Sequence, residues 1–182
     1  MENEPLSLDP TLDTMHIDLP PAVLPLFEAA GPHRPPDSLP GIPTDHPAFA
    51  ILSRFDGAHV GECGRGEECA TSDIAFGADP DHQAMAEVLH WERLLGTRLI
   101  QVAEVHHGHG LLLVGGDGTC YGMSLVHDAF WFEGASFGEA VERLLLGRKG
   151  QPMLRPGQAS VSMHGETFKP GHPGLHRDDL GD

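Results

Sequence analysis

The chain has 182 residues, with 11 Lys and Arg against 27 Asp and Glu, so its formal net charge is −16 at pH 7. This acidity argues against binding a nucleic-acid backbone or an anionic membrane, because both attract clustered cationic side chains. The chain starts without the basic and apolar regions of a secretory signal and has no run of about 20 apolar residues, so we expect a cytoplasmic protein that does not span a membrane.

Residues 1–17 are acidic and polar, and they are predicted to be a disordered segment. Two helices, separated by a Pro-rich connector, and then two strands are predicted beyond it. The helices lie within residues 18–31 and 44–57, and the strands cover residues 58–63 and 71–76. Asp18 is a candidate cap for the first helix, and Pro47 suits the first turn of the second.

The clearest helical pattern spans residues 79–96. Asp79 suits the cap of this helix, Pro80 its first position and Gly96 its end. Its apolar residues recur at helical spacing in one stripe, made by Ala84, Val88, Trp91 and Leu95. We therefore expect one continuous helix here.

Strands dominate the next part of the sequence, and a helix and a tail follow them. The strands are predicted over residues 98–105, 110–114, 119–126 and 128–132. Their short connections predict antiparallel neighbours. Ser136 and Glu139 have the spacing of a capping box at the start of a helix over residues 136–147. Residues 151–182 are rich in Gly, Pro and His without any period, and they are predicted to be a flexible tail.

The stretch EVHHGHG raises the question of a metal site, because it contains His106, His107 and His109. On an extended strand His107 and His109 share a face while His106 points away, which gives two ligands. Catalytic zinc needs three protein ligands, so a third would have to come from His127 or Cys120 on a neighbouring strand. Under this hypothesis the protein is a metal-dependent enzyme.

A hairpin turn explains the same stretch without a metal. His107-Gly108 fits the two central positions of a tight turn, because histidine is among the few residues besides glycine that are enriched at positive φ. His106 and His109 then oppose each other across the hairpin. We favour this interpretation, and we expect neither a metal nor a cofactor.

Other sequence signals of catalysis are missing. The chain has no G-x-S-x-G elbow, no P-loop, no dinucleotide-binding glycine motif and no H-E-x-x-H. Cys63 and Cys69 are spaced too widely for a C-x-x-C pair, and we expect free thiols. The sequence therefore indicates a protein that is not an enzyme.

The order of these elements from about Leu26 to Gly150 resembles the SUKH superfamily of bacterial immunity proteins, particularly its third subfamily. The stretch LFEAAGPHRPPD is similar to a helix of that group that ends in Ala-Ala-Gly before a Pro/Arg/Asp connector. FAILSRFDGAHV resembles its Phe-Gly-Gly helix end, with Asp56-Gly57 in place of Gly-Gly. LLLVGGDGTCYGM resembles its Asp-Gly hairpin, and FEGASFGEAVERLLLGRK is the closest match of all.

The resemblance implies an α+β fold in which a single antiparallel sheet of about five to six strands is flanked by helices. Residues 18–150 would form this SUKH-like immunity domain. Its implied role is to bind and neutralise a cognate toxin domain, commonly a nuclease or a nucleic-acid deaminase, by occluding it. The family has no catalytic residues to carry over. The alternative is an interaction or regulatory module whose partner is not a toxin.

The charge suggests which residues contact such a partner. An acidic surface speeds the encounter with a basic protein by about 10- to 10³-fold at low salt, although acidity also serves solubility alone. The candidates are acidic residues near the hairpins and the last strand, together with one aromatic anchor. They are Glu104, Asp117, Asp128, Trp131 and Glu133.

Overall fold

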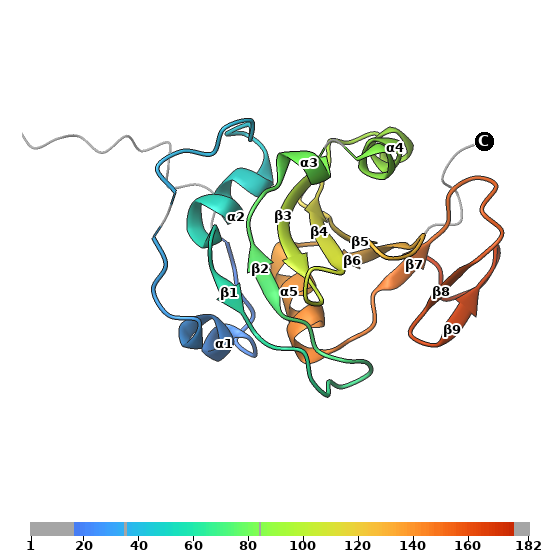
Figure 1. The fold of residues 1–182 in the computed structure, drawn as a ribbon. Coiled ribbons are helices and arrows are strands. Elements are labelled where there is room, and N and C mark those ends of the chain that lie inside the picture. The colour runs from blue at the N-terminus through green and yellow to red at the C-terminus, as the bar shows by residue number, and fades with distance from the viewer. Residues whose placement is uncertain (1–16, 35, 84, 177–182) are drawn as a thin grey trace, which may run out of the picture.

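The computed structural model describes residues 17–34, 36–83 and 85–176 (Figure 1). The segment predicted to be disordered, residues 1–17, lies outside these ranges except for its last residue. No helix in the described ranges is both long enough and apolar enough to cross a bilayer.

Seven strands form one antiparallel sheet in which each strand pairs with its neighbours in the sequence. The strands are β1 (His59–Val60), β2 (Ile74–Phe76), β3 (Ile100–Val105), β4 (Gly110–Val114), β5 (Cys120–Ser124), β6 (Phe130–Gly134) and β7 (Gln151–Met153). The prediction of an α+β fold with one antiparallel sheet is confirmed. The sheet is slightly larger than predicted, because β7 comes from the segment expected to be a tail.

Five helices surround this sheet in the described part of the chain. They are α1 (Leu24–Ala29), α2 (Pro47–Phe55), α3 (Pro80–Gln83), α4 (Ala86–Leu95) and α5 (Phe137–Leu146). Pro47 starts α2, as predicted, and Gly96 ends α4 in the left-handed conformation. Asp18 does not cap α1, which begins after Val23 without a side-chain cap.

The helix predicted over residues 79–96 is divided into α3 and α4. Met85 precedes α4 with an extended backbone (φ −61°, ψ 138°), which no helix interior contains. The Gln83 side chain donates to the Leu99 carbonyl and accepts from the Gln101 amide, so the end of α3 is tied to the start of β3. This attachment to the sheet explains a break that the helical spacing did not reveal.

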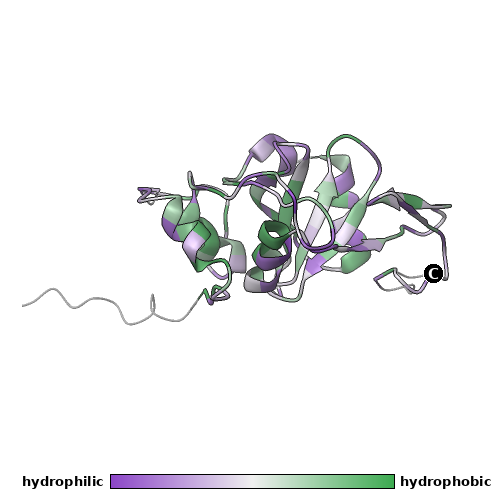
Figure 2. Cartoon of the chain, turned by 90° about the horizontal axis from the view of Figure 1, so that it is seen from below, coloured by the Kyte–Doolittle hydropathy of each residue, from purple (hydrophilic) through white to green (hydrophobic). Residues whose placement is uncertain are grey.

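The sheet is covered on both faces, and β4 shows this most clearly. Leu112 and Val114 belong to a core that includes α2 and α5, whereas Leu111 and Leu113 belong to a second core with Trp91 of α4. All five residues of β4 are buried, because alternate side chains point into the two cores. Figure 2 shows the hydrophobic residues gathered in the central strands and in the helices beside them.

The segment after α5 contains regular structure, contrary to the prediction of a tail. β7 pairs with β6 at the edge of the sheet, and β8 (Val161–Met163) pairs with β9 (Glu166–Phe168) in a separate hairpin. Val161, Met163 and Phe168 pack with Trp131 of β6 in a third apolar cluster. Strands of three residues are too short for their periodicity to be recognised in a sequence.

Candidate functional site

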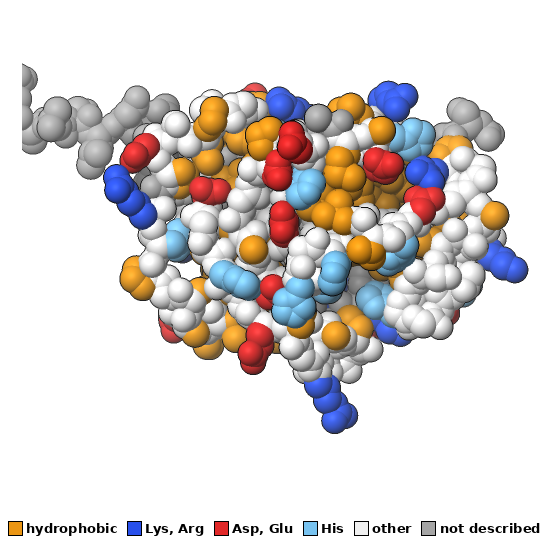
Figure 3. All heavy atoms as spheres, in the orientation of Figure 1, with side chains coloured by type: hydrophobic (Ala, Val, Ile, Leu, Met, Phe, Trp, Pro, Cys, Tyr) orange, Lys and Arg blue, Asp and Glu red, His pale blue; other side chains and the backbone are white. Residues whose placement is uncertain are grey.

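A pocket of about 320 Å³ lies at the end of the sheet where β3 turns into β4 and β5 turns into β6. The loop before β2, the C-terminal part of α5 and the β8–β9 turn complete its walls. Its lining includes four histidines, one tryptophan and one glutamate, namely His106, His109, His127, His164, Trp131 and Glu133. Figure 3 shows histidine side chains gathered in the middle of this face, with acidic side chains above them.

The β3–β4 turn forms one side of the pocket. The His109 amide donates to the His106 carbonyl (3.1 Å), and φ is 56° at His107 and 76° at Gly108. The prediction that His107-Gly108 forms the centre of a hairpin turn is therefore confirmed. His106 also has a positive φ of 53°, which the sequence did not predict.

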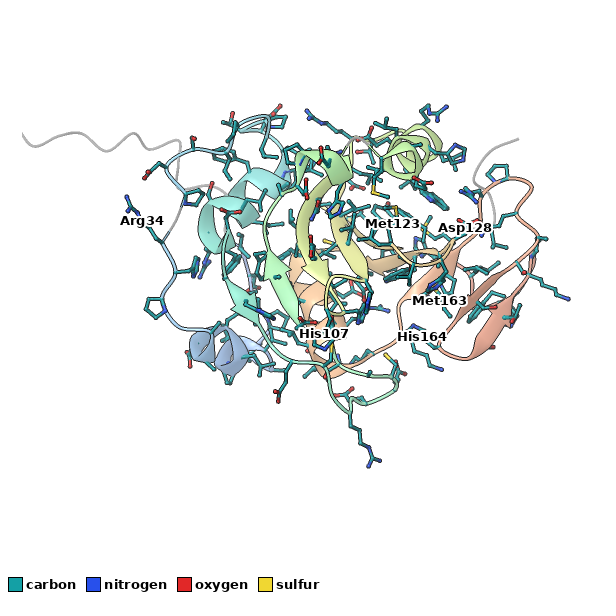
Figure 4. All side chains as sticks on the ribbon, in the orientation of Figure 1. Arg34, His107, Met123, Asp128, Met163 and His164 are labelled. Carbon is teal, nitrogen blue, oxygen red and sulfur yellow. The ribbon has the colours of Figure 1, made fainter. Side chains whose placement is uncertain are left out.

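This turn separates the three histidines that the metal hypothesis placed together. His106 and His109 line the pocket, whereas the His107 ring lies beside Asp73, with Nδ1 3.3 Å from Oδ2. Figure 4 shows His107 on this turn and His164 on the C-terminal hairpin. Within the described residues, the side chains spaced closely enough to share a metal ion are two other groups: Cys63, Asp73 and His107, and Asp79, His82 and Glu104.

The proposed additional ligands of that hypothesis also lie apart. His127 does line the pocket, but Cys120 is buried at the opposite end of β5, paired with Val114. The structure therefore does not bring His106, His107 and His109 together with a ligand from β5.

Trp131 and Glu133 are the two predicted contact residues that the structure does bring together. The Trp131 indole Nε1 donates to Glu133 Oε2, and both side chains are buried. Burial raises the pKa of Glu133 to about 7, although the hydrogen bond from Trp131 and the charge of Arg143 oppose this shift. Glu133 therefore changes its charge near neutral pH.

Burial also acts on the histidines of the pocket. It lowers the pKa of His106 and of His164, because the surrounding protein disfavours their charged forms. Both imidazoles are therefore held more strongly in the neutral form than they would be in water.

The two arginines that line the pocket are paired with carboxylates of the same chain. Arg143 Nη2 lies 2.7 Å from Glu139 Oε1, and Arg148 Nε lies 2.7 Å from Glu67 Oε2. Arg148 also reaches Glu142 at 3.3 Å. Since these cations already have partners, they do not make the pocket a site for an anionic ligand.

A serine and a histidine in the pocket meet at hydrogen-bond distance. Ser124 Oγ lies 3.0 Å from His127 Nδ1, a separation that a nucleophile and its general base also show. The same hydroxyl accepts from the amides of Val126 and His127, both at 3.2 Å. These hydrogen bonds give Ser124 a structural role, because they stabilise the β5–β6 turn.

The three remaining predicted contact residues lie on separate parts of the surface. Glu104 is half exposed on β3, with its Oε1 3.9 Å from Nδ1 of His82. Asp117 lies in the β4–β5 turn at the other end of the sheet, where its carboxylate accepts from the Thr119 amide (3.0 Å) and hydroxyl (2.9 Å). Asp128 lies in the β5–β6 turn and forms an ion pair with Arg155.

Sequence reasoning missed Asp73, which is buried just before β2. Its carboxylate accepts from the His107 amide (2.8 Å) and the Cys63 thiol (3.3 Å), and it lies 3.2 Å from His59 Nε2. These partners come from separate parts of the sequence with no motif spacing. An acidic residue directly before an apolar strand is the only signal that the sequence offers for this cluster.

One comparison with known proteins gives a match. A family model described as SUKH-3 immunity protein matches residues 46–147, which is more than half of the chain and extends from the start of α2 to the end of α5. No curated protein and no solved structure matches the chain. The residues that β8–β9 contributes to the pocket lie beyond the matched range.

Proposed function

The chain belongs to the SUKH-3 immunity protein family, and from this premise we propose that it binds one cognate toxin domain and neutralises it by occlusion. The family match is the observation that carries the proposal. The toxin class that we propose is a nuclease or a nucleic-acid deaminase. Such enzymes need a basic surface for their substrate, and a protein with a net charge of −16 is suited to compete for it.

We propose that the inhibitor acts in the cytoplasm without any catalysis of its own. The free Cys63, Cys69 and Cys120 support that compartment, because disulfides are rare where thiols are kept reduced. Inhibition by occlusion requires a folded surface of suitable charge and no reacting group. The purified protein should therefore inhibit at equimolar ratio and should not be consumed.

The accessible carboxylates Glu104, Asp117 and Asp128 are the contacts that we propose for the basic surface of the toxin. Asp117 lies at the opposite end of the sheet from Asp128, so one partner would touch all three only by extending along the length of the sheet. Trp131 and Glu133 are buried, and a partner reaches them only with a side chain that enters the pocket. A basic side chain there would stabilise the ionised form of Glu133.

Where a neighbouring gene encodes a toxin domain, co-expression of that domain with this chain tests the function directly. If the chain is an immunity protein, growth is restored and the purified proteins form a complex. A regulatory module with another partner would leave the cells poisoned, and that result would reject the toxin-binding role.

A charge-matched pair of triple variants tests the contacts. Glu104→Gln, Asp117→Asn and Asp128→Asn together should slow association by about 10-fold or more at low salt and by less at high salt. The control removes three exposed carboxylates near α1 and α2 through Glu28→Gln, Asp37→Asn and Asp45→Asn. Equal slowing by both triple variants would show that net charge, rather than these three contacts, governs association.

A third variant addresses the metal-dependent enzyme considered for His106, His107 and His109. Asparagine is the suitable replacement, because φ is positive at His106 and His107 and asparagine tolerates that conformation. Growth protection should survive the triple Asn variant. If the variant lost both growth protection and a catalytic turnover that the wild type shows, the metal-dependent enzyme would be favoured instead.

A further inference from the structure

Three side chains that carry metal-binding atoms meet the carboxylate of Asp73, and none of these four residues lines the pocket. His59 comes from β1, Cys63 from the loop after it, and His107 from the turn itself. The ligand atoms of Cys63, Asp73 and His107 all lie within 4.8 Å of one another. The cluster has no part in the proposed inhibition of a toxin, and its chemistry is independent of that function.

We propose that Cys63, Asp73 and His107, with His59 as the fourth ligand, bind one Zn²⁺ ion. A thiolate, two imidazoles and a carboxylate are the donor types that zinc takes in proteins. Magnesium and calcium prefer sites made of oxygen atoms alone, so this set discriminates against them.

The spacing of the donor atoms fits a tetrahedral ion. Zinc bonds of about 2.0–2.3 Å give a tetrahedron whose edges are about 3.3–3.7 Å. His107 Nδ1 and His59 Nε2 lie 3.3 Å and 3.2 Å from Oδ2 of Asp73, and Cys63 Sγ lies 3.3 Å from the other oxygen, Oδ1. Small movements would bring Cys63, Asp73 and His107 onto one ion, whereas His59 lies outside the group of ligand atoms that are all within 4.8 Å of one another, so its exposed ring has to turn further to become the fourth ligand.

The exposure of the ligand side chains suits the same role. Asp73 is fixed, since its side chain is 8% exposed and Oδ1 already accepts the His107 amide, which leaves Oδ2 for an ion. The side chains of His59 and His107 are 62% and 66% exposed, so both rings are accessible to solvent and able to adjust. The buried carboxylate thus holds the position of the site while the exposed ligands close around it.

A site with four protein ligands has no open position, and it is structural rather than catalytic. The ion would join β1, the start of β2 and the β3–β4 turn, which are up to 48 residues apart in the sequence (107 − 59 = 48). It would hold the turn that supplies His106 and His109 to the pocket. Since zinc binds the folded chain, it would also stabilise the fold by mass action.

Zinc and cobalt titrations of the full-length chain without an affinity tag test the proposal. After chelator treatment and dialysis, zinc is added in competition with a chromophoric chelator, and we expect one tightly bound ion per chain. Cobalt(II) should give the visible bands of tetrahedral coordination and a thiolate-to-cobalt absorption in the near ultraviolet. Bound zinc should also protect Cys63 from alkylation, read by peptide mass spectrometry, while Cys69 stays as reactive as before.

Matched variants decide which residues hold the ion. Cys63→Ser and His107→Asn should each weaken zinc binding by more than about 100-fold, because losing even a residue that orients a ligand costs about 10- to 100-fold. Cys69→Ser and His109→Asn, which alter the same loop and the same turn, should leave the affinity unchanged. The proposal is overturned if the chain binds no zinc. It is also overturned if zinc binding survives Cys63→Ser and His107→Asn, because the ion would then be held by the pocket histidines or by Asp79, His82 and Glu104.

Discussion

The indole Nε1 of Trp131 donates a hydrogen bond to the carboxylate of Glu133, two residues further along β6, and both side chains are buried. The bond gives the tryptophan its polar partner, and it leaves an acid inside the protein beside a pocket of histidines. Burial raises the pKa of Glu133 to about 7, so the stability of the fold and the charge of the pocket depend on the same proton.

Glu133→Gln should remove a pH dependence of stability. The folded pKa of Glu133 is about 7 and lies above the ordinary 4.5, so the folded chain binds the proton more tightly than the unfolded chain does. This contribution to the free energy of unfolding is fully present below about pH 4.5 and is lost as the pH rises to about 7. The loss is about 1.4 kcal/mol per pH unit, or about 2–4 kcal/mol in total. Gln keeps an acceptor for Trp131 without the titration.

Urea unfolding of both proteins across this pH range checks the prediction. The free energy of unfolding of the variant, relative to the wild type, should rise as the pH increases from about 4.5 to about 7 and stay constant above that. A difference that is the same at every pH would show that Glu133 does not titrate in this window.

Gly122→Ala should destabilise the protein, because the Trp131 ring lies across Gly122 on the neighbouring strand. A Cβ atom built at Gly122 falls 2.0 Å from Trp131 Cε2, which no side-chain packing tolerates. We expect the free energy of unfolding to fall by about 1–3 kcal/mol or more, as overpacking of a core does.

The matched control for this substitution is Gly77→Ala. The nearest atom to its Cβ would be Asp56 Oδ1 at 3.7 Å, an ordinary contact. It should change the free energy of unfolding by no more than about 0.5 kcal/mol. Chemical denaturation of the two variants compares them, and equal effects would contradict the close approach of Trp131 to Gly122.

Elements whose boundaries are set by local chemistry were predicted well. Pro47 at the start of α2, Gly96 after α4 and Ser136 before α5 each act on the backbone within one turn, so the sequence alone places them. The His107-Gly108 turn is another such case, since positive φ limits the residues that fit it.

Features that depend on contacts across the fold were missed. The break between α3 and α4 comes from Gln83 bonding to the start of β3, and no local pattern encodes that contact. The Asp73 cluster and the pocket are assembled from several segments by the order of strands in the sheet. Glu133 is buried although its charge suggested exposure; Trp131 donates a hydrogen bond to its carboxylate, and burial raises its pKa.

Ser136→Ala should weaken the start of α5. Ser136 Oγ accepts from the Glu139 amide (3.3 Å), as the capping box predicts, whereas the Glu139 carboxylate accepts from the Ala135 amide (2.9 Å) instead of that of Ser136. Losing the serine cap should lower the free energy of unfolding by about 1 kcal/mol, within a range of about 0.5–2 kcal/mol.

Ser160→Ala, at an exposed position outside the helices, is the control and should have no measurable effect. Thermal unfolding followed by circular dichroism distinguishes them, and equal melting temperatures for the two variants would contradict the cap.

Truncation after Gly150 should destabilise the domain, although the sequence suggests that only a tail is lost. The cut removes β7 from the edge of the sheet and removes Val161, Met163 and Phe168 from Trp131. At about 1.5–3 kcal/mol for each buried side chain, these three contacts alone are worth about 5–9 kcal/mol, which is comparable to the total stability of a typical domain, about 5–15 kcal/mol.

The truncated chain should therefore unfold at a much lower urea concentration, and its tryptophan emission should shift to the red as Trp131 meets water. A chain that ends at His176 keeps all the residues that the structure describes and serves as the control. If the two truncated chains unfold at the same urea concentration, the β8–β9 hairpin contributes nothing to the core. The boundary of the folded unit would then fall near Gly150, as the sequence predicts. If only the shorter chain is weakened, β7 and the β8–β9 hairpin together belong to the folded unit.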